Sequence, residues 1–192
     1  MRYLPIKRSL DVLIAVLLGV GLLPVFLLIG LIIRLDSKGP VLFRQTRIGR
    51  YSKPFTIYKY RTMHVLAPSD MPTADLPNPE EQLTRIERFL RKSSVDELPQ
   101  LINILKGDMS IIGPRPVIPV ETELIAARKA NGADRIFPGI TGLAQVIGRD
   151  ELDHIEKARY DGQYAAQMSL GLDLKIFVQT VGMIISRKHI AH

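Results

Sequence analysis

The sequence contains no cysteine, which removes several kinds of chemistry at once. A chain without thiols forms no disulfide, binds no zinc through thiolates and has no cysteine nucleophile. The histidines offer little more, because they are scattered along the chain without the spacing of metal ligands (His64, His154, His189, His192). These absences argue against a cysteine or histidine metal site and against thiol catalysis.

Familiar nucleotide and hydrolase motifs are also missing. There is no GxxxxGK[ST] phosphate loop, and Gly19-Val20-Gly21 lies inside an apolar run without a third glycine. No GxSxG elbow is present either. P-loop, dinucleotide-binding and serine-hydrolase folds therefore have no support in this sequence.

What the sequence has in excess is positive charge. Lys and Arg outnumber Asp and Glu by 26 to 19, and the formal net charge is +7. This balance favours an anionic partner, such as nucleic acid, anionic lipid or a phosphorylated substrate. Aromatic residues make up only 6% of the chain and no nucleic-acid recognition module is visible, so we do not expect nucleic acid as a partner.

Residues 12–33 form an uninterrupted apolar run that predicts a membrane segment. As a straight helix the run would reach ~33 Å, enough for a ~30 Å hydrocarbon core. A signal peptide is disfavoured, because no small-residue cleavage site follows and the run is overlong. Pro24 near the middle and basic residues at both ends favour a helix that breaks and returns to the same face. These residues alone leave a straight span and a re-entrant hairpin equally open.

The remainder of the chain predicts an α+β, mainly helical protein. Two short extended pieces (41–45 and 55–63) follow a turn at 37–40 and form a short β element with a basic face. A proline-rich loop at 67–79 precedes predicted helices, of which the first is amphipathic and suited to a membrane interface (80–92, 96–106, 120–130, 150–168, 172–186). Gly107 and Gly132 are expected to end two of them.

The segment Ser94-Val95-Asp96-Glu97 carries the sharpest local signal. Ser94 and Glu97 have the spacing of a helix capping box, and acidic residues in a first turn complement the helix dipole. Adjacent carboxylates can instead hold a divalent cation beside a phosphate, and one of them can attack phosphorus. From this stretch alone, capping is the preferred interpretation.

Two further motifs combine glycine or proline with a polar residue. In Gly113-Pro114-Arg115-Pro116 the prolines restrict the backbone on both sides of an arginine, whose planar guanidinium suits phosphate oxygens. A rigid surface turn explains the same motif equally well. The glycines of the segment 138–142 (PGITG) would let the backbone approach a ligand, or would only form a turn.

Taken together, the motifs resemble those of the monotopic bacterial phosphoglycosyl transferases, a family of polyprenyl sugar-phosphate transferases, and specifically its small subclass. The resemblance runs through FRQTRIG, IYKYRTM, SSVDELPQLINILKGDMSIIGPRP, PGITGLAQVIGR, ARYDGQY and LDLKIFVQT, so it covers nearly the whole chain. It implies a re-entrant membrane helix over residues 1–36, broken at Pro24, and a cytoplasmic-face catalytic domain with interfacial helices over 37–192. The sequence departs from the family at Leu23, where members commonly have a hydroxyl residue that could satisfy a freed carbonyl.

The resemblance also implies an activity and a set of site residues. Asp96 is expected to attack the phosphoryl group next to the sugar of a UDP-sugar, with UMP as leaving group, and polyprenol phosphate (undecaprenyl phosphate) is expected to accept the sugar phosphate. Asp96 and Glu97 would hold Mg²⁺ together with substrate oxygens. The residues expected to bind phosphate or nucleotide, or to position metal or substrate, are Lys59, Arg91, Arg115, Arg149 and Asp161.

The same resemblance implies a place in the cell and leaves two rivals. The enzyme would lie on the cytoplasmic face of the bacterial inner membrane, in contact with membrane lipid, and would initiate glycan or polysaccharide assembly. The sugar and the oligomeric state are left open, with a homo-oligomer possible. The alternatives are a glycosyltransferase that releases UDP and a noncatalytic membrane-anchored assembly factor. No DxD-like metal motif is found for the glycosyltransferase. The assembly factor leaves Asp96, Glu97 and Arg115 unexplained.

Overall fold

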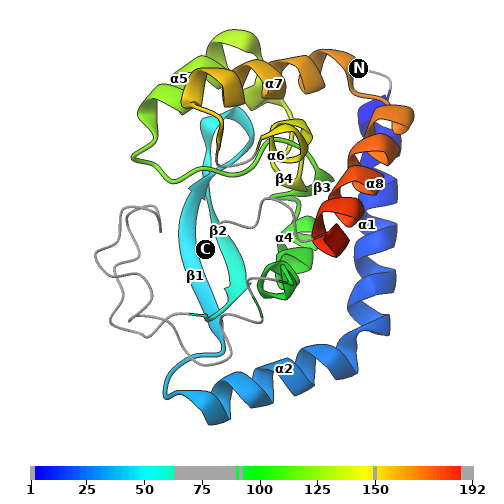
Figure 1. Ribbon diagram of the computed structural model, residues 1–192, viewed down its shortest axis with the longest axis vertical. Coiled ribbons are helices and arrows are strands. Elements are labelled where there is room, and N and C mark those ends of the chain that lie inside the picture. The colour runs from blue at the N-terminus through cyan, green and yellow to red at the C-terminus, as the bar shows by residue number, and fades with distance from the viewer. Residues whose placement is uncertain (1–2, 63–89, 91–92, 149–150, 187–192) are drawn as a thin grey trace.

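The computed structural model describes residues 3–62, 90, 93–148 and 151–186, and these are mainly helical (Figure 1). The described strands form two two-stranded sheets, β1 with β2 and β3 with β4. The prediction of an α+β, mainly helical fold with a short β element is therefore confirmed. The helices and strands in chain order are α1 (Tyr3–Gly21), α2 (Leu23–Asp36), β1 (Leu42–Ile48), β2 (Pro54–Tyr60), α4 (Gln100–Lys106), β3 (Ser110–Ile112), α5 (Thr122–Asn131), β4 (Gly139–Thr141), α6 (Leu143–Ile147), α7 (His154–Gln167) and α8 (Leu170–Ser186).

The apolar N-terminal run is divided into α1 and α2, which meet at Leu22. Pro24 lies at the start of α2, where it lacks an N–H for the helical ladder and its ring disfavours continuation of α1. Taken singly, no described helix is both long enough and apolar enough to cross a bilayer, whereas α1 and α2 pass that test together, with a bend of 64° between them. The predicted break at Pro24 is thus present despite Leu23, and the return of the chain to the same membrane face stays a prediction.

Polar side chains attach α1 to the rest of the molecule. The Lys7 ammonium lies 2.8 Å from the Asp173 carboxylate of α8. Asp11 accepts hydrogen bonds from the Ser110 hydroxyl and the Ile111 N–H of β3. Lys7, Asp11 and Asp173 are all buried, so these contacts fix α1 beside α8 and β3 (Figure 1).

The β1–β2 hairpin is attached to α4, and this attachment prepares the site. The two strands pair antiparallel along their whole length, with Lys59 opposite Phe43. Asn103 of α4 is fully buried; its amide donates to the Thr56 carbonyl at 2.7 Å and accepts from the Tyr58 N–H at 3.0 Å. Because these contacts lie on β2, the segment before α4 is held near the end of β2 that carries Lys59.

Glycine caps explain which helix ends were predicted correctly. Gly107 (φ 89°) follows α4 and Gly132 (φ 81°) follows α5, both in the left-handed conformation that favours glycine. The structure confirms helices close to the predicted 96–106, 120–130 and 172–186, although a 3₁₀ turn (Val95–Glu97) precedes α4. The predicted helix 150–168 starts later, at His154, because Asp153 and Glu156 form a capping box. The predicted loop 67–79 lies outside the described residues, as does the predicted helix 80–92 except for Leu90.

The second sheet depends on close packing between glycines. A Cβ atom on Gly113 would overlap the Phe137 carbonyl, and one on Gly139 would overlap the Gly113 N–H. A Cβ atom on Gly142 would overlap the Gly113 carbonyl. The glycines of the PGITG segment therefore allow two backbone segments to approach each other, and this structural interpretation explains them without a ligand.

Candidate active site

Asp96 and Glu97 lie in the 3₁₀ turn that precedes α4, but the predicted capping box is wrong. Ser94 has a left-handed backbone (φ 55°, ψ 17°) and its side chain makes no capping hydrogen bond. Glu97 does not reach back to the backbone of Ser94, because its carboxylate is occupied by two cations from other parts of the chain. The local spacing suggested a helix cap, but the Glu97 side chain instead forms ion pairs with residues far away in the sequence.

Glu97 connects two of the predicted site cations. The Lys59 ammonium of β2 lies 2.7 Å from Glu97 Oε1, and the Arg115 guanidinium lies 3.1 Å from the same oxygen. The Glu97 and Lys59 side chains are only 13% and 17% exposed, whereas that of Arg115 is 40% exposed. The structure therefore brings Lys59, Glu97 and Arg115 together, with the arginine on the side that a substrate can reach.

This bridge determines the ionisation of Glu97. Burial alone would raise the pKa of the Glu97 carboxyl, but the charges and hydrogen bonds of Lys59 and Arg115 outweigh burial and hold its pKa well below the usual range. Burial lowers the pKa of the Lys59 ammonium and the Arg115 charge adds to that, while Glu97 opposes both. Glu97 is therefore a carboxylate at neutral pH, paired with cations that also suit phosphate.

Asp96 is adjacent to this bridge and is buried, with 8% of its surface exposed. Both cations contact Glu97 through Oε1. Within the described part of the chain no group of three or more His, Cys, Asp or Glu side chains forms a ready metal site. Two neighbouring carboxylates with hard oxygen atoms nevertheless fit Mg²⁺, which is usually held by one or two carboxylates and completed by substrate phosphate and water.

Asp161 lies in α7, where it pairs with an arginine of α5. Its carboxylate is 1% exposed and pairs with Arg128 of α5, at 2.7 Å from Nη2 and 2.8 Å from Nε. Burial raises the pKa of Asp161 above the ordinary aspartate value, and the Arg128 charge acts in the opposite direction. Asp161 is linked to the site through Arg128, which in turn contacts the Arg115 carbonyl.

Three further predicted residues remain, Arg91, Arg149 and Pro24. Arg91 and Arg149 lie outside the described residues. Pro24 lies at the junction of α1 and α2. The prediction that Arg91 and Arg149 bind the nucleotide therefore stays a prediction.

Sequence reasoning missed two arginines that contact the Arg115 segment, Arg47 and Arg128. Arg47 of β1 donates to the Pro116 carbonyl at 3.2 Å. Burial lowers the pKa of the Arg47 guanidinium to about 10, and the nearby Arg115 charge contributes to the shift. Arg47 stands in the FRQTRIG motif, which could have drawn attention to it, whereas Arg128 resembles any cation in the last turn of a helix.

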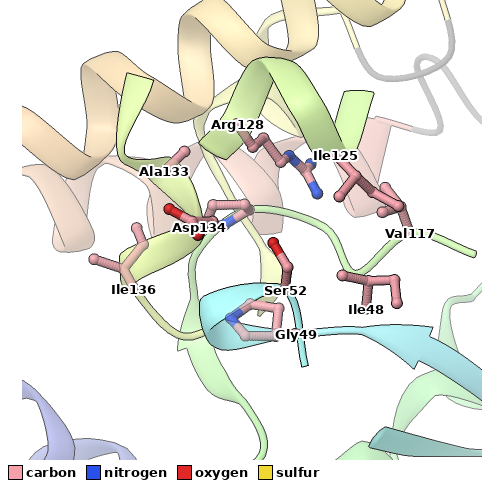
Figure 2. Close-up of a pocket in the computed structure, with 11 residues that line it drawn as sticks. Ile48, Gly49, Ser52, Val117, Ile125, Arg128, Ala133, Asp134 and Ile136 are labelled. Atoms are coloured by element: carbon pink, nitrogen blue, oxygen red, sulfur yellow. The ribbon is translucent and has the colours of Figure 1, made fainter. Parts of the chain in front are cut away.

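A small pocket is lined by Pro114 and Val117, on either side of Arg115, and by residues of α5. Arg128, Ser52 and Asp134 enter it among apolar side chains such as Val117, Ile125 and Ile136 (Figure 2). Of the described residues, neither Asp96 nor the Lys59–Glu97–Arg115 group lines this pocket. The ion-pair group, rather than the pocket, has the charges that a phosphorylated substrate needs.

Comparison with known proteins places the chain in a family. Residues 2–187 match the model of the bacterial sugar transferases. A UDP-glucose:undecaprenyl-phosphate glucose-1-phosphate transferase of Caulobacter vibrioides is 44% identical over 188 residues, which cover 94% of this chain and 70% of that protein. An Escherichia coli protein of the same name is 40% identical over 92% of this chain but only 39% of its own length.

A third relative has a similar length. The sugar transferase EpsL of Bacillus subtilis is 40% identical, over 94% of this chain and 87% of its own length. The motifs that carry Lys59, Asp96, Glu97 and Arg115 all lie within the residues that the family model matches. The chain therefore belongs to the bacterial sugar transferase family.

Proposed function

We propose that this protein transfers a sugar 1-phosphate from a UDP-sugar to undecaprenyl phosphate or a similar polyprenol phosphate and releases UMP. The observation that carries the proposal is the Glu97 carboxylate bridged by Lys59 and Arg115 directly beside the buried Asp96. The names of the Caulobacter and Escherichia coli relatives support the same class of reaction and make UDP-glucose the first donor to test. The reaction would initiate glycan or polysaccharide assembly.

Asp96 is the proposed nucleophile. A carboxylate oxygen forms a bond to the phosphorus next to the sugar, the bond from that phosphorus to the bridging oxygen breaks, and UMP leaves with the electron pair. An oxygen of the carrier phosphate then attacks the same phosphorus and releases the Asp96 carboxylate, which yields the sugar diphosphate-linked carrier. Atoms and charges balance without any further reactant.

Repulsion between Asp96 and the diphosphate is the main obstacle to this attack. Arg115 is exposed enough to contact phosphate oxygens, and Lys59 contacts the same oxygen of Glu97. The two cations balance the formal charge of Asp96 and Glu97 but leave the substrate's own charge to be neutralised. Mg²⁺ held by Asp96 and Glu97 would supply that additional positive charge.

The bent α1–α2 pair supports a re-entrant arrangement in the membrane. Large apolar side chains are more than half exposed along α2, including Leu27, Leu31 and Leu35, as expected for contact with lipid. Basic residues flank the pair on both sides, which favours a cytoplasmic location for both ends. We therefore place the catalytic domain on the cytoplasmic face of the bacterial inner membrane.

The proposal is tested by product analysis with the full chain in detergent. The protein is incubated with Mg²⁺ and UDP-glucose, then with other UDP-hexoses and UDP-N-acetylhexosamines, and UMP release is measured with and without undecaprenyl phosphate. Intact mass is recorded before the carrier is added. We expect UMP and a sugar-phosphate adduct on the wild type, with neither on Asp96→Asn.

Asp134→Asn is a matched control, because it removes a carboxylate that lies outside the Glu97 bridge. This variant is expected to form the adduct. Release of UDP in place of UMP would favour a glycosyltransferase, and an Asp96→Asn variant with full activity would exclude Asp96 as nucleophile. The absence of product with every donor and with the carrier present would favour the assembly factor.

A further inference from the structure

The segment that carries Arg115 has to be held in place with few backbone N–H donors. Pro114 and Pro116 have no N–H, so the backbone on either side of Arg115 has few donors with which to pair. Rigid φ angles at the prolines do not fix the position of the segment relative to Glu97. Its position has to be held through carbonyl oxygens, which accept hydrogen bonds from other elements.

Four successive carbonyls of this segment each accept such a bond. The Pro114 carbonyl accepts from the Gly139 N–H at 2.9 Å, and the Val117 carbonyl accepts from the Ile48 N–H at 2.8 Å. Between them, the Arg115 carbonyl accepts from Arg128 Nη1 at 2.8 Å and the Pro116 carbonyl from Arg47 Nη1 at 3.2 Å. The two inner contacts come from guanidinium groups, one on α5 and one on β1.

Arg128 is itself held in place. Its Nε and Nη2 contact Asp161 of α7, and its Nη1 contacts the Arg115 carbonyl, so one planar guanidinium joins three elements. Arg128 is 8% exposed and Asp161 is 1% exposed, which leaves water little access to either group. A hydrogen bond from a charged, buried donor is stronger than one between neutral groups.

We infer that Arg128, anchored by Asp161, and Arg47 are positioning residues that hold the Arg115 backbone so that its guanidinium meets Glu97 and the substrate phosphate. The part that concerns phosphate depends on the function proposed above, whereas the part that concerns the backbone does not. The inference also gives Asp161 a role in positioning that runs through Arg128.

Arg128→Lys is the informative variant. The lysine retains a cation for Asp161, but a single ammonium lacks the planar fork that reaches the carboxylate and the carbonyl together. Lys129→Gln is the matched control, because it removes an exposed cation from the next position of α5. If Arg128→Lys folds poorly, Arg128→Met combined with Asp161→Leu removes both buried charges at once and leaves neither unpaired.

The first readout does not depend on activity. Hydrogen exchange is measured by mass spectrometry on the full chain in detergent, over a peptide spanning residues 111–119. Loss of a charged hydrogen bond is expected to speed exchange by about tenfold or more in Arg128→Lys at Gly113 and Ile118, whose N–H groups donate to the Thr141 carbonyl and the Glu121 carboxylate. Lys129→Gln is expected to exchange as the wild type does, and unchanged protection in both Arg128 variants would overturn the inference.

The second readout is kinetic and uses a double-mutant cycle for UMP release. If Arg128 acts through Arg115, its replacement lowers kcat/KM on the order of 100-fold in the wild-type background, as expected for a misplaced catalytic cation. The same replacement changes little in an Arg115→Ala background, because the group it positions is already gone. Equal losses in both backgrounds would overturn the inference and assign Arg128 a general structural role. A wild type that turns over no donor would contradict the proposed function, and the exchange experiment would still decide whether Arg128 holds the segment.

Discussion

Glu97 is the residue on which the site cations converge, and its ionisation makes a testable contribution to stability. Because its folded-state pKa lies well below the unfolded value of about 4.3, the carboxylate stabilises the fold at neutral pH. Glu97→Gln leaves Lys59 and Arg115 without their shared partner, and we expect a loss on the order of 3 kcal/mol at pH 7. The measurement is thermal unfolding of wild type and variant in detergent.

The pH dependence of stability tests whether Glu97 is ionised in the folded protein. A carboxyl whose pKa is lower in the folded state stabilises the fold. This stabilisation is fully present above the pKa of the unfolded state and is lost as the pH falls toward the folded-state pKa. The difference in Tm between wild type and Glu97→Gln is therefore expected to be constant near neutrality and to narrow below about pH 4. Glu123→Gln, which removes a carboxylate that is 70% exposed, should show little difference throughout. A Glu97→Gln difference that persists unchanged into acid would contradict the assigned ionisation.

The residues of the site were only partly predictable. Asp96, Glu97, Lys59 and Arg115 belong to motifs that resemble a known family, and the structure brings the last three into contact. Local rules misread the capping spacing at Ser94, because the partners of Glu97 lie 38 and 18 positions away. Nothing in the sequence marked Arg128 as part of the site, because a buried arginine cannot be distinguished from a solvent-exposed one in a sequence.

At the scale of elements, the contact between β3 and the PGITG segment predicts a sharp difference between glycines. A Cβ atom on Gly113 would collide with the Phe137 carbonyl, so Gly113→Ala should destabilise the protein by about 1–3 kcal/mol or more. Gly182 in α8 has open space around its Cβ position, and Gly182→Ala should stabilise the helix by roughly 0.5–1 kcal/mol. Thermal unfolding of both variants measures this, and a harmless Gly113→Ala would contradict the packing.

Helix boundaries show what local sequence can and cannot determine. Gly107 and Gly132 end their helices through their own backbone preference, so both ends could be predicted. The pairing of β3 with β4 joins residues about 29 positions apart and depends on glycine contacts that no periodicity reveals. The bend between α1 and α2 followed from Pro24, while its angle depends on how both helices pack.

For the whole molecule, the absence of cysteine makes the membrane arrangement directly testable. Ser9→Cys, in the first part of α1, and Lys38→Cys, after α2, introduce single thiols on either side of the apolar run 12–33, each at an exposed position. A re-entrant pair keeps both thiols in the cytoplasm, so neither should react with a membrane-impermeant reagent in intact cells. Both should react once the membrane is permeabilised.

A spanning arrangement gives a different pattern. One of the two thiols would then be modified in intact cells, and that result would overturn the re-entrant topology. Gly21→Cys, next to the bend, serves as a reference for a thiol within the apolar segment, and it should react slowly with a charged reagent in either case.

Contacts between the N-terminal helices and the rest of the fold connect the apolar segment to the candidate site. Lys7 and Asp11 fix α1 to α8 and β3, and the Tyr60 hydroxyl donates to the Phe26 carbonyl, which fixes α2 to β2 close to Lys59. These contacts connect the apolar helices to the strand that carries Lys59, whose ammonium contacts Glu97 next to Asp96. On the function proposed above, the depth of α2 in lipid would set the height of Asp96 above the hydrocarbon, and with it the level at which Asp96 meets the phosphate of the membrane-anchored carrier.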